Sequence, residues 1–168
     1  MSVIIANSSP IIGLSKISRL SLLKDLWSEI IIPEAVYREV VIKGKNKPGV
    51  KTIKDSCESW IKTVPVKNKA EVRALRAILD EGEAEVIALA QELRANLMLI
   101  DNREPRIFAQ NLGFRFIGTV GIIQLAWQKG LIIDPLQEIY KLRLNSFWLS
   151  DKLIEEIKKE IQEQLKDL

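Results

Sequence analysis

The chain has 168 residues, of which 47% are hydrophobic and 28% are charged, and its formal net charge is +3. This length and composition suit one globular domain and exclude a disordered chain. Histidine is absent and Cys57 is the single cysteine, which excludes Ser-His-Asp and Cys-His catalysis, zinc bound by histidine or several thiolates, and an internal disulfide. Catalysis must therefore rest on Asp, Glu, Lys or a hard cation such as Mg²⁺.

The sequence predicts a cytoplasmic protein without a membrane partner. No apolar run approaches the ~20 residues that a membrane span needs. Residues 1–12 are apolar but carry no basic segment, so we expect no signal peptide. A lone cysteine in a chain without an export signal suits a reducing compartment.

The first part of the chain alternates short apolar runs with helical segments. In chain order, the pattern predicts a strand at 3–6, a helix at 10–26 broken near Ser18, a strand at 29–32, a helix at 33–42, a loop at 44–49 and a short strand at 60–66. Pro33 is expected in the first turn of its helix. Pro65 would confine the last strand to an edge of the sheet.

The same alternation continues to the end of the chain. The pattern predicts a helix opened by a capping box at Asn68 and Glu71, a helix at 83–94, a strand at 96–100, a helix at 103–111 capped near Gly113, a strand at 114–117, a helix at 120–129 and helical structure after Asp134. Alternating strands and helices indicate a parallel sheet of four or five strands with helices on both faces.

We expect one domain over residues 1–168, with the helices at about 134–168 packing on it or on a partner. The last helix carries an apolar stripe at three- to four-residue spacing, formed by Leu153, Ile154, Ile157, Ile161 and Leu165. Such a stripe packs on its own domain or forms a dimer or partner surface. The sequence leaves both interpretations open.

Two predicted strands end in short polar side chains. The first runs into Asn7, Ser8 and Ser9, and the strand at 96–100 runs into Asp101 and Asn102. Ligands of open parallel sheets bind beyond the carboxyl ends of the strands, so these oxygens are candidates for a binding site. The alternative is that each is only a helix N-cap, a role that Asn, Ser and Asp all fill well.

Two glutamates lie in line with the apolar faces of their helices. Glu83 shares a face with Val86, Ile87 and Ala90, and Glu39 shares one with apolar neighbours. A carboxylate that points inward must be paired, hydrogen-bonded or bound to metal. The alternatives are that Glu83 complements the helix dipole and that Glu39 lies at the edge of its stripe. Glu85 and Glu92 are expected to be solvated.

Together these residues predict a site for a divalent cation. Carboxylates that gather in one crevice repel one another unless a cation is present. Their hard oxygens suit Mg²⁺ or Mn²⁺, which can activate water and stabilise the leaving oxygen in phosphodiester cleavage.

A run without acids carries five lysines, Lys43, Lys45, Lys47, Lys51 and Lys54. One interpretation is a solvated loop. The other is a patch that follows the phosphates of a nucleic acid, for which Lys43, Lys45, Lys47 and Lys51 are the candidates.

Five motifs in this order resemble the PIN-domain superfamily, in particular its VapC-like toxin branch (the DUF3368 group). They are Asn7-Ser-Ser-Pro-Ile-Ile-Gly-Leu, Ile32-Pro-Glu-Ala-Val-Tyr-Arg-Glu39, Asp80-Glu-Gly-Glu-Ala-Glu-Val-Ile-Ala-Leu-Ala90, Leu99-Ile-Asp-Asn-Arg103 and Ile117-Gly-Thr-Val-Gly121, and the likeness covers about residues 3–165. It implies a three-layer α/β/α domain with a mostly parallel sheet. It also implies a Mg²⁺- or Mn²⁺-dependent ribonuclease, often dimeric and often the toxin partner of an antitoxin protein.

Carried over by position, the resemblance implies catalytic roles for Glu39, Glu83 and Asp101. It implies a metal held by Asn7, Glu39, Glu83, Asp101 and Asn102, supported by Ser8, Ser9 and Thr119. Asn7 and Asn102 stand where the family usually shows acids, so three carboxylates remain of five. An amide oxygen can bind metal but carries no charge and cannot act as a base. The alternative function is therefore a module that binds nucleic acid or protein with weakened or lost catalysis.

A phosphoaspartyl protein is a third class, but Asn7 cannot be its nucleophile and Asp101 lies late in the chain. A P-loop nucleotide site is excluded, since the chain has no Gly-x-x-x-x-Gly-Lys motif.

Overall fold

Five parallel strands form one sheet in the order β3-β2-β1-β4-β5 in the computed structural model, which describes residues 2–167. The strands are β1 (Ile4–Ala6), β2 (Ile30–Pro33), β3 (Ile61–Val64), β4 (Leu97–Leu99) and β5 (Phe116–Ile117). β1 lies at the centre, where Ile5 is paired with Ile31 on one side and with Met98 on the other. All three residues of β1 are buried, as a strand covered on both faces requires.

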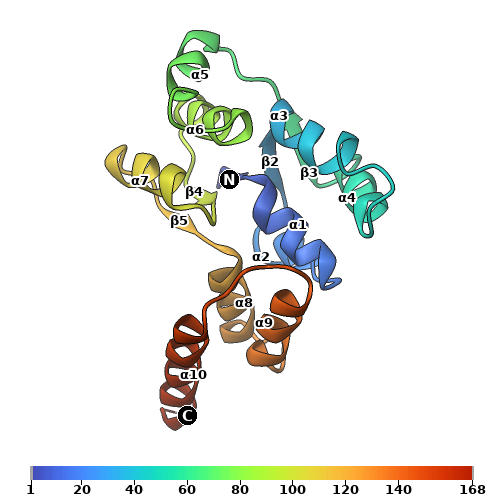
Figure 1. Cartoon of the computed structure of the whole chain (residues 1–168), viewed down its shortest axis with the longest axis vertical. Coiled ribbons are helices and arrows are strands. Elements are labelled where there is room, and N and C mark those ends of the chain that lie inside the picture. The colour runs from blue at the N-terminus through green and yellow to red at the C-terminus, as the bar shows by residue number, and fades with distance from the viewer. Residues whose placement is uncertain (1, 168) are drawn as a thin grey trace.

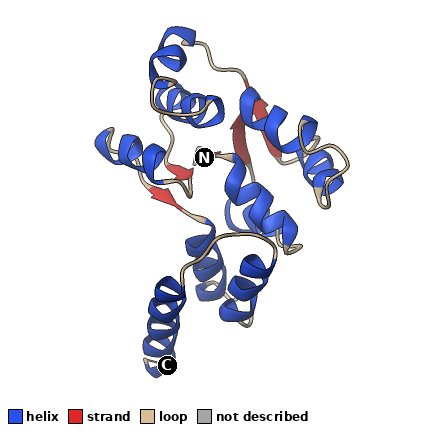
Figure 2. Cartoon of the chain, viewed as in Figure 1, coloured by secondary structure: helices blue, strands red, loops and turns tan. Residues whose placement is uncertain are grey.

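Helices fill every connection between the strands (Figures 1 and 2). They are α1 (Ser8–Lys16), α2 (Ser21–Trp27), α3 (Glu34–Tyr37), the π-helical segment η1 (Arg38–Ile42), α4 (Val50–Cys57), α5 (Lys69–Leu75), α6 (Glu81–Leu93), α7 (Arg103–Asn111), α8 (Thr119–Gln128), α9 (Pro135–Leu144) and α10 (Asp151–Lys166). The expected three-layer α/β/α fold is confirmed, and its sheet is parallel throughout.

The strand order reverses at β1, and this reversal locates a crevice. The chain moves outward from β1 to β2 and β3, then crosses back to β4 and β5 on the other side. Right-handed crossovers place the helices of these two halves on opposite faces of the sheet. Figure 1 shows α5, α6 and α7 grouped away from α1 and α4. In such sheets the ligand crevice opens between the carboxyl ends of the two strands at the reversal, here β1 and β4.

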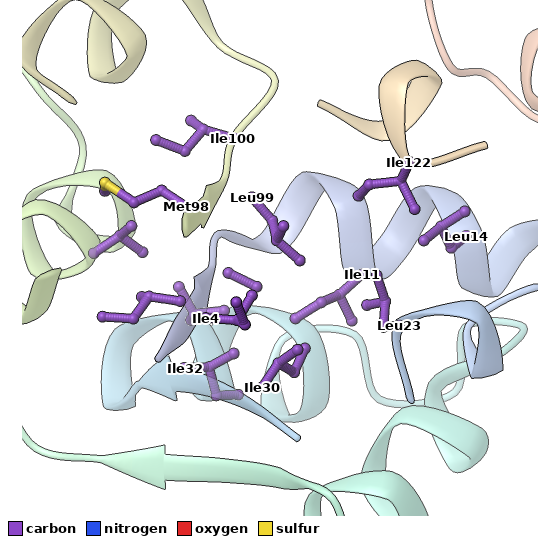
Figure 3. Close-up of a cluster of buried hydrophobic side chains, with 14 of the residues drawn as sticks. Ile4, Ile11, Leu14, Leu23, Ile30, Ile32, Met98, Leu99, Ile100 and Ile122 are labelled. Atoms are coloured by element: carbon purple, nitrogen blue, oxygen red, sulfur yellow. The ribbon is translucent and has the colours of Figure 1, made fainter. Parts of the chain in front are cut away.

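The core side chains labelled in Figure 3 are aliphatic, apart from the thioether of Met98. Ile4, Ile30 and Ile32 of neighbouring strands lie near Ile11 of α1, and none of the four is more than 3% exposed. Leu14 and Leu23 extend this layer towards Ile122 of α8. These contacts hold the start of α1, which carries the strand-end residues, firmly against the sheet.

Most predicted elements are confirmed, including the break at Ser18, which has a positive φ of 59°. The prediction for Pro33 was wrong, because this residue ends β2 and precedes α3 instead of lying in its first turn. α4 was not predicted, because Ile53 is its one buried apolar residue and Gly49 gives it no side-chain cap. β3 is an edge strand, as Pro65 indicated.

Glu85 corrects a second prediction, since it is buried and not solvated. Its exposed fraction is 4%, and its Oε2 accepts a hydrogen bond from the Ala35 backbone N–H at 3.1 Å. Pro33 offers no side-chain cap to α3, so α6 supplies the missing acceptor for this helix N-terminus. Glu92 was also expected to be solvated. It is partly buried and accepts hydrogen bonds from the backbone N–H groups of Lys67 and Asn68.

The Glu85→Gln substitution should stabilise the fold at pH 7. Burial raises the pKa of Glu85 above its ordinary value of 4.5, more than the Ala35 N–H lowers it. Because the folded state holds this proton more tightly than the unfolded state does, stability is lost as pH rises from the ordinary pKa towards the raised pKa of Glu85. Glutamine keeps the acceptor oxygen without the charge. In urea unfolding, the free energy of unfolding of this variant should therefore exceed that of the unchanged chain at pH 7, and the difference should shrink at pH 4. A variant less stable than the unchanged chain at pH 7 would contradict this account.

The C-terminal helices pack on the chain's own elements. Ile154, Ile157 and Ile161 of α10 are buried, Glu160 accepts a hydrogen bond from Gln124 of α8, and Lys158 lies 5.7 Å from the ring centre of Tyr140 on α9. The stripe therefore covers its own domain, while Leu153 and Leu165 remain 36% and 53% exposed. Within residues 2–167, no helix has the length and apolar character to span a membrane.

Candidate functional site

The ends of β1 and β4 bring the predicted strand-end residues together. The backbone N–H of Asn7 donates to the carbonyl oxygen of Leu99 at 3.0 Å, which extends the ladder by one residue. Asp101 and Asn102 follow within three residues of Leu99. Residues from opposite halves of the sequence thus meet at the crevice where the strand order reverses.

Asn7 is both a helix cap and a residue of this crevice. Its Oδ1 accepts a hydrogen bond from the Ser8 backbone N–H at 2.9 Å, which makes it the N-cap of α1. The hydroxyl of Ser8 donates to Oε1 of Glu39 at 3.0 Å. The start of α1 is therefore tied directly to the glutamate that the sequence singled out on the next helical unit.

Glu39 lies on the π-helical segment η1, an unusual local geometry that occurs often at functional sites. Its side chain is half-buried, whereas its neighbours Glu34 and Arg38 are exposed. Arg38 pairs with Glu81 at 2.7 Å instead of with Glu39. Oε1 of Glu39 accepts the hydrogen bond from the Ser8 hydroxyl, and Oε2 accepts no hydrogen bond from residues 2–167.

Glu83 lies at the start of its helix and is also hydrogen-bonded inside the protein. The sequence had left these two roles open as alternatives. Together with Asp80 it forms a capping box at the start of α6, in which Oε2 of Glu83 accepts from the Asp80 N–H at 3.1 Å. Its Oε1 accepts from Nδ2 of Asn102 at 2.7 Å. Glu83 is only 8% exposed, so this carboxylate joins the helix start to the end of β4.

Asp101 is held by the start of α8. Its two carboxylate oxygens accept from the backbone N–H and the hydroxyl of Thr119, both at 2.7 Å. Thr119 is fully buried. Both of these hydrogen bonds fix the position of Asp101, and they leave it facing a different hollow from Glu39.

Two adjoining hollows open on these residues. The first, of about 320 Å³, is lined by Asn7, Ser8, Ser9, Ile12, Gly13, Lys16, Glu39, Asp80, Asn102, Ser146 and Phe147. The second, of about 720 Å³, contains Asp101. Ser9, Asn102, Ser146 and Phe147 line both hollows, so the two adjoin, and together they are called the groove.

Asp80, Lys16 and Phe147 were not predicted as site residues. Asp80 stands three residues before Glu83, as an N-cap does, and this role concealed its carboxylate. Phe147 comes from the linker between α9 and α10, whose position no local pattern reveals. Only the spacing of Asp80 before Glu83 could have indicated a further acid.

Three side-chain oxygens approach one point beside Gly82. A Cβ atom added to Gly82 would lie 3.2 Å from Oε2 of Glu39 and 3.6 Å from Oδ1 of both Asn7 and Asp80. These are hard oxygens of the kind that Mg²⁺ and Mn²⁺ prefer. Among residues 2–167, however, no three Asp, Glu or Cys side chains lie close enough to hold a metal ion. The point beside Gly82 is therefore approached by two carboxylates and one amide, not by three acids.

The Gly82→Ala variant should bind Mn²⁺ about three- to tenfold more weakly, as measured by calorimetry. Its methyl group would occupy the space between the three oxygens and displace the Glu39 carboxylate by a few tenths of an ångström. Alanine is favoured over glycine in helices by up to about 1 kcal/mol, so the melting temperature should stay the same or rise. Unchanged Mn²⁺ affinity in this variant would mean that the cation does not bind beside Gly82.

The structure divides the predicted lysine patch. Lys45, Lys47, Lys51 and Lys54 surround a separate hollow with Tyr37, Val41 and Val50. Lys43 instead lines a small hollow with Arg38, Glu39 and Asp80. Of these lysines, Lys43 is therefore the one that shares a hollow with the acids.

A family model described as DUF3368, a PIN domain, matches residues 3–163. A search of curated proteins found no match.

Proposed function

Because the chain belongs to the PIN-domain family, a nuclease-type fold, we propose that it cleaves RNA phosphodiester bonds with the help of Mg²⁺ or Mn²⁺. The observation that supports this proposal best is the approach of Asn7, Glu39 and Asp80 to one point beside Gly82. That point lies at the carboxyl edge of a parallel sheet where the strand order reverses, which is where such folds bind their ligands.

Each of the surrounding residues then has a defined task. Asn7, Glu39 and Asp80 would hold the cation, which when bound would lower the pKa of a coordinated water and neutralise charge on the phosphate. Oε2 of Glu39 faces the point beside Gly82 and accepts no hydrogen bond within residues 2–167, so it would be the ligand atom of this carboxylate. Glu83 and Asp101 act as positioning residues. Glu83 holds the amide of Asn102, and Asp101 holds Thr119 at the start of α8. Lys16 supplies positive charge at the first hollow, and Lys43 does so at the small neighbouring hollow that also contains Glu39 and Asp80.

A binding module with weak or lost catalysis is the second candidate. The amide of Asn102 donates to Glu83, an arrangement that satisfies this carboxylate without any cation. Asn7 likewise brings an oxygen to the site without a charge. Fewer negative charges mean weaker binding of a divalent cation, while the groove could still hold RNA.

The biological setting forms part of the same proposal. We propose a VapC-like toxin that acts on cellular RNA in the cytoplasm, inhibited by an antitoxin protein and assembled as a homodimer. The exposed residues of the α10 stripe, Leu153 and Leu165, are available to a second copy of the chain. Residues 1–168 are proposed to act as one domain.

A cleavage assay with three cations and a chelator tests the proposed activity. Purified chain is incubated with end-labelled single-stranded RNA in Mn²⁺, Mg²⁺, Ca²⁺ or EDTA, beside Glu39→Gln and the matched control Glu34→Gln. Cleavage should require Mn²⁺ or Mg²⁺, persist in the Glu34→Gln control and fall below detection in Glu39→Gln. Equal cleavage by all three proteins would identify a contaminating nuclease and remove the support for catalysis.

A further inference from the structure

The second hollow of the groove has a different chemical character from the first. It lies next to Asp101 and is lined by Arg106, Phe116, Phe147 and Trp148, together with small residues at the start of α8. One cation and three aromatic rings thus line the same hollow as Asp101. The proposed reaction does not use any of these four residues.

Arg106 is held in place as a binding group would be. Its Nε donates to the carbonyl oxygen of Ile100 at 2.8 Å, and its guanidinium carbon lies 5.2 Å from the centre of the Phe116 ring. A side chain at Gly118 would collide with Nη2 of Arg106 and lie 2.8 Å from Oδ1 of Asp101. Arg106 forms no salt bridge with any residue between 2 and 167.

The linker between α9 and α10 presents Trp148 at the same hollow. On one side of it, Phe147 packs on α1, where a Cβ added to Gly13 would lie 3.1 Å from its ring. On the other side, Leu149 is 5% exposed. Trp148 itself is 83% exposed. The linker is therefore anchored at both neighbours while the indole faces solvent at the rim of the groove.

We propose that this second hollow binds the nucleotide adjacent to the cleaved bond of single-stranded RNA, with its base stacked on Trp148 and its phosphate beside Arg106. This inference rests on the proposed function, since the groove joins the two hollows through Ser9, Asn102 and Phe147. Aromatic faces and arginine are the groups that bind single-stranded nucleic acids without base-pair readout. Charge complementarity favours RNA, because a phosphate would give the guanidinium the anion that it lacks.

Binding is measured without cleavage, so that this inference and the proposed activity can fail separately. The probe is a fluorescently labelled 2′-O-methyl RNA oligonucleotide, which resists hydrolysis, in EDTA. Trp148→Ala should raise the Kd at least about fivefold, as expected for the loss of one stacked base. Trp148→Phe should stay within about twofold. Arg106→Gln should weaken binding and reduce its salt dependence. The matched control is Ile133→Ala, which removes a 97% exposed side chain that lines neither hollow.

Equal affinity of Trp148→Ala and the unchanged chain would overturn the subsite, whatever the cleavage assay shows. So would a loss of dimer in Trp148→Ala by sedimentation without a change in RNA affinity, because Trp148 would then be a contact between copies. Binding that depends on Trp148 in a chain that never cleaves RNA would support the subsite and reject the proposed activity.

Discussion

The double variant Asn7→Asp, Asn102→Asp should cleave RNA at least about tenfold faster in Mn²⁺ than the unchanged chain. Both amides lie at the first hollow, and each substitution would place a carboxylate of the same shape there. Additional carboxylates raise the affinity of a site for a divalent cation. Asp is as good an N-cap as Asn, so the start of α1 should be preserved.

The same variant should also become dependent on metal for part of its stability. Nδ2 of Asn102 now donates to Glu83, and an aspartate there would place two carboxylates next to each other. Without a cation they repel, which should lower the free energy of unfolding by about 1–2 kcal/mol. Added Mn²⁺ should restore it, and a melting curve with and without 1 mM Mn²⁺, as a rough working concentration, measures the difference.

The matched control is Gln162→Glu with Gln164→Glu, which adds the same two charges to the exposed side of α10. It should change neither cleavage nor the Mn²⁺ dependence of melting. A folded double aspartate variant that binds Mn²⁺ but does not cleave RNA would reject the nuclease and favour the binding module. A gain in cleavage would reject the binding module.

The Arg19→Met variant should lower the free energy of unfolding at pH 7 by about 2 kcal/mol, because it leaves a buried carboxylate poorly compensated. Glu138 of α9 is 2% exposed, and its Oε1 accepts from Nη2 of Arg19 at 2.9 Å. Lys141 lies farther away at 3.5 Å, and Oε2 of Glu138 is buried without a partner among residues 2–167. Lys141 remains next to Glu138 in this variant, and Arg19 is partly exposed. The expected loss in the free energy of unfolding is therefore smaller than for a fully buried ion pair.

The effect should depend on pH in a defined direction. Burial alone would raise the pKa of Glu138, but the hydrogen bond and charge of Arg19, with Lys141, hold it below the ordinary value of 4.5. A lowered carboxyl pKa contributes stability that is present above the ordinary pKa and lost as pH falls through the folded-state value. Urea unfolding should therefore show the full difference between the two proteins at pH 7 and a smaller one near pH 3.

Arg143→Met is the control for the Arg19 experiment. Arg143 pairs with Asp151 at 2.6 Å, but both side chains are exposed. Exposed pairs contribute about 0–1 kcal/mol, so this variant should unfold almost as the unchanged chain does. An equal loss in both arginine variants would show that burial of Glu138 is not the cause.

Much of the site could be predicted because it follows from local features. Asn7 and Asp101 each come directly after an apolar run, and parallel strands bring their carboxyl ends to one edge of the sheet. Glu39 and Glu83 were identified by their place on apolar helix faces. The structure places Asn7 and Glu39 at the first hollow, joins Glu83 to it through Asn102, and places Asp101 at the second.

Burial across elements could not be predicted in this way. Glu85 was expected to be solvated, but the packing of α3 on α6 buries it, and its carboxylate then accepts a hydrogen bond at the start of α3, where Pro33 gives no cap. Asp80 was hidden by its role as an N-cap, and it becomes a site residue only because Glu39 comes from another helical unit to the same point. α4 carries too few buried apolar residues for its periodicity to be detected.

By itself the sequence determined the alternation of strands and helices, the parallel sheet and the edge at which the polar residues gather, since these depend on patterns within a few residues. Only the tertiary structure decided which oxygens approach one another. It divided the predicted ligand set between two hollows, added Asp80 beside Gly82, and placed Arg106 and Trp148 next to the acids. The physical reason is that distances between side chains of different elements depend on how those elements pack, and packing is a property of the whole chain.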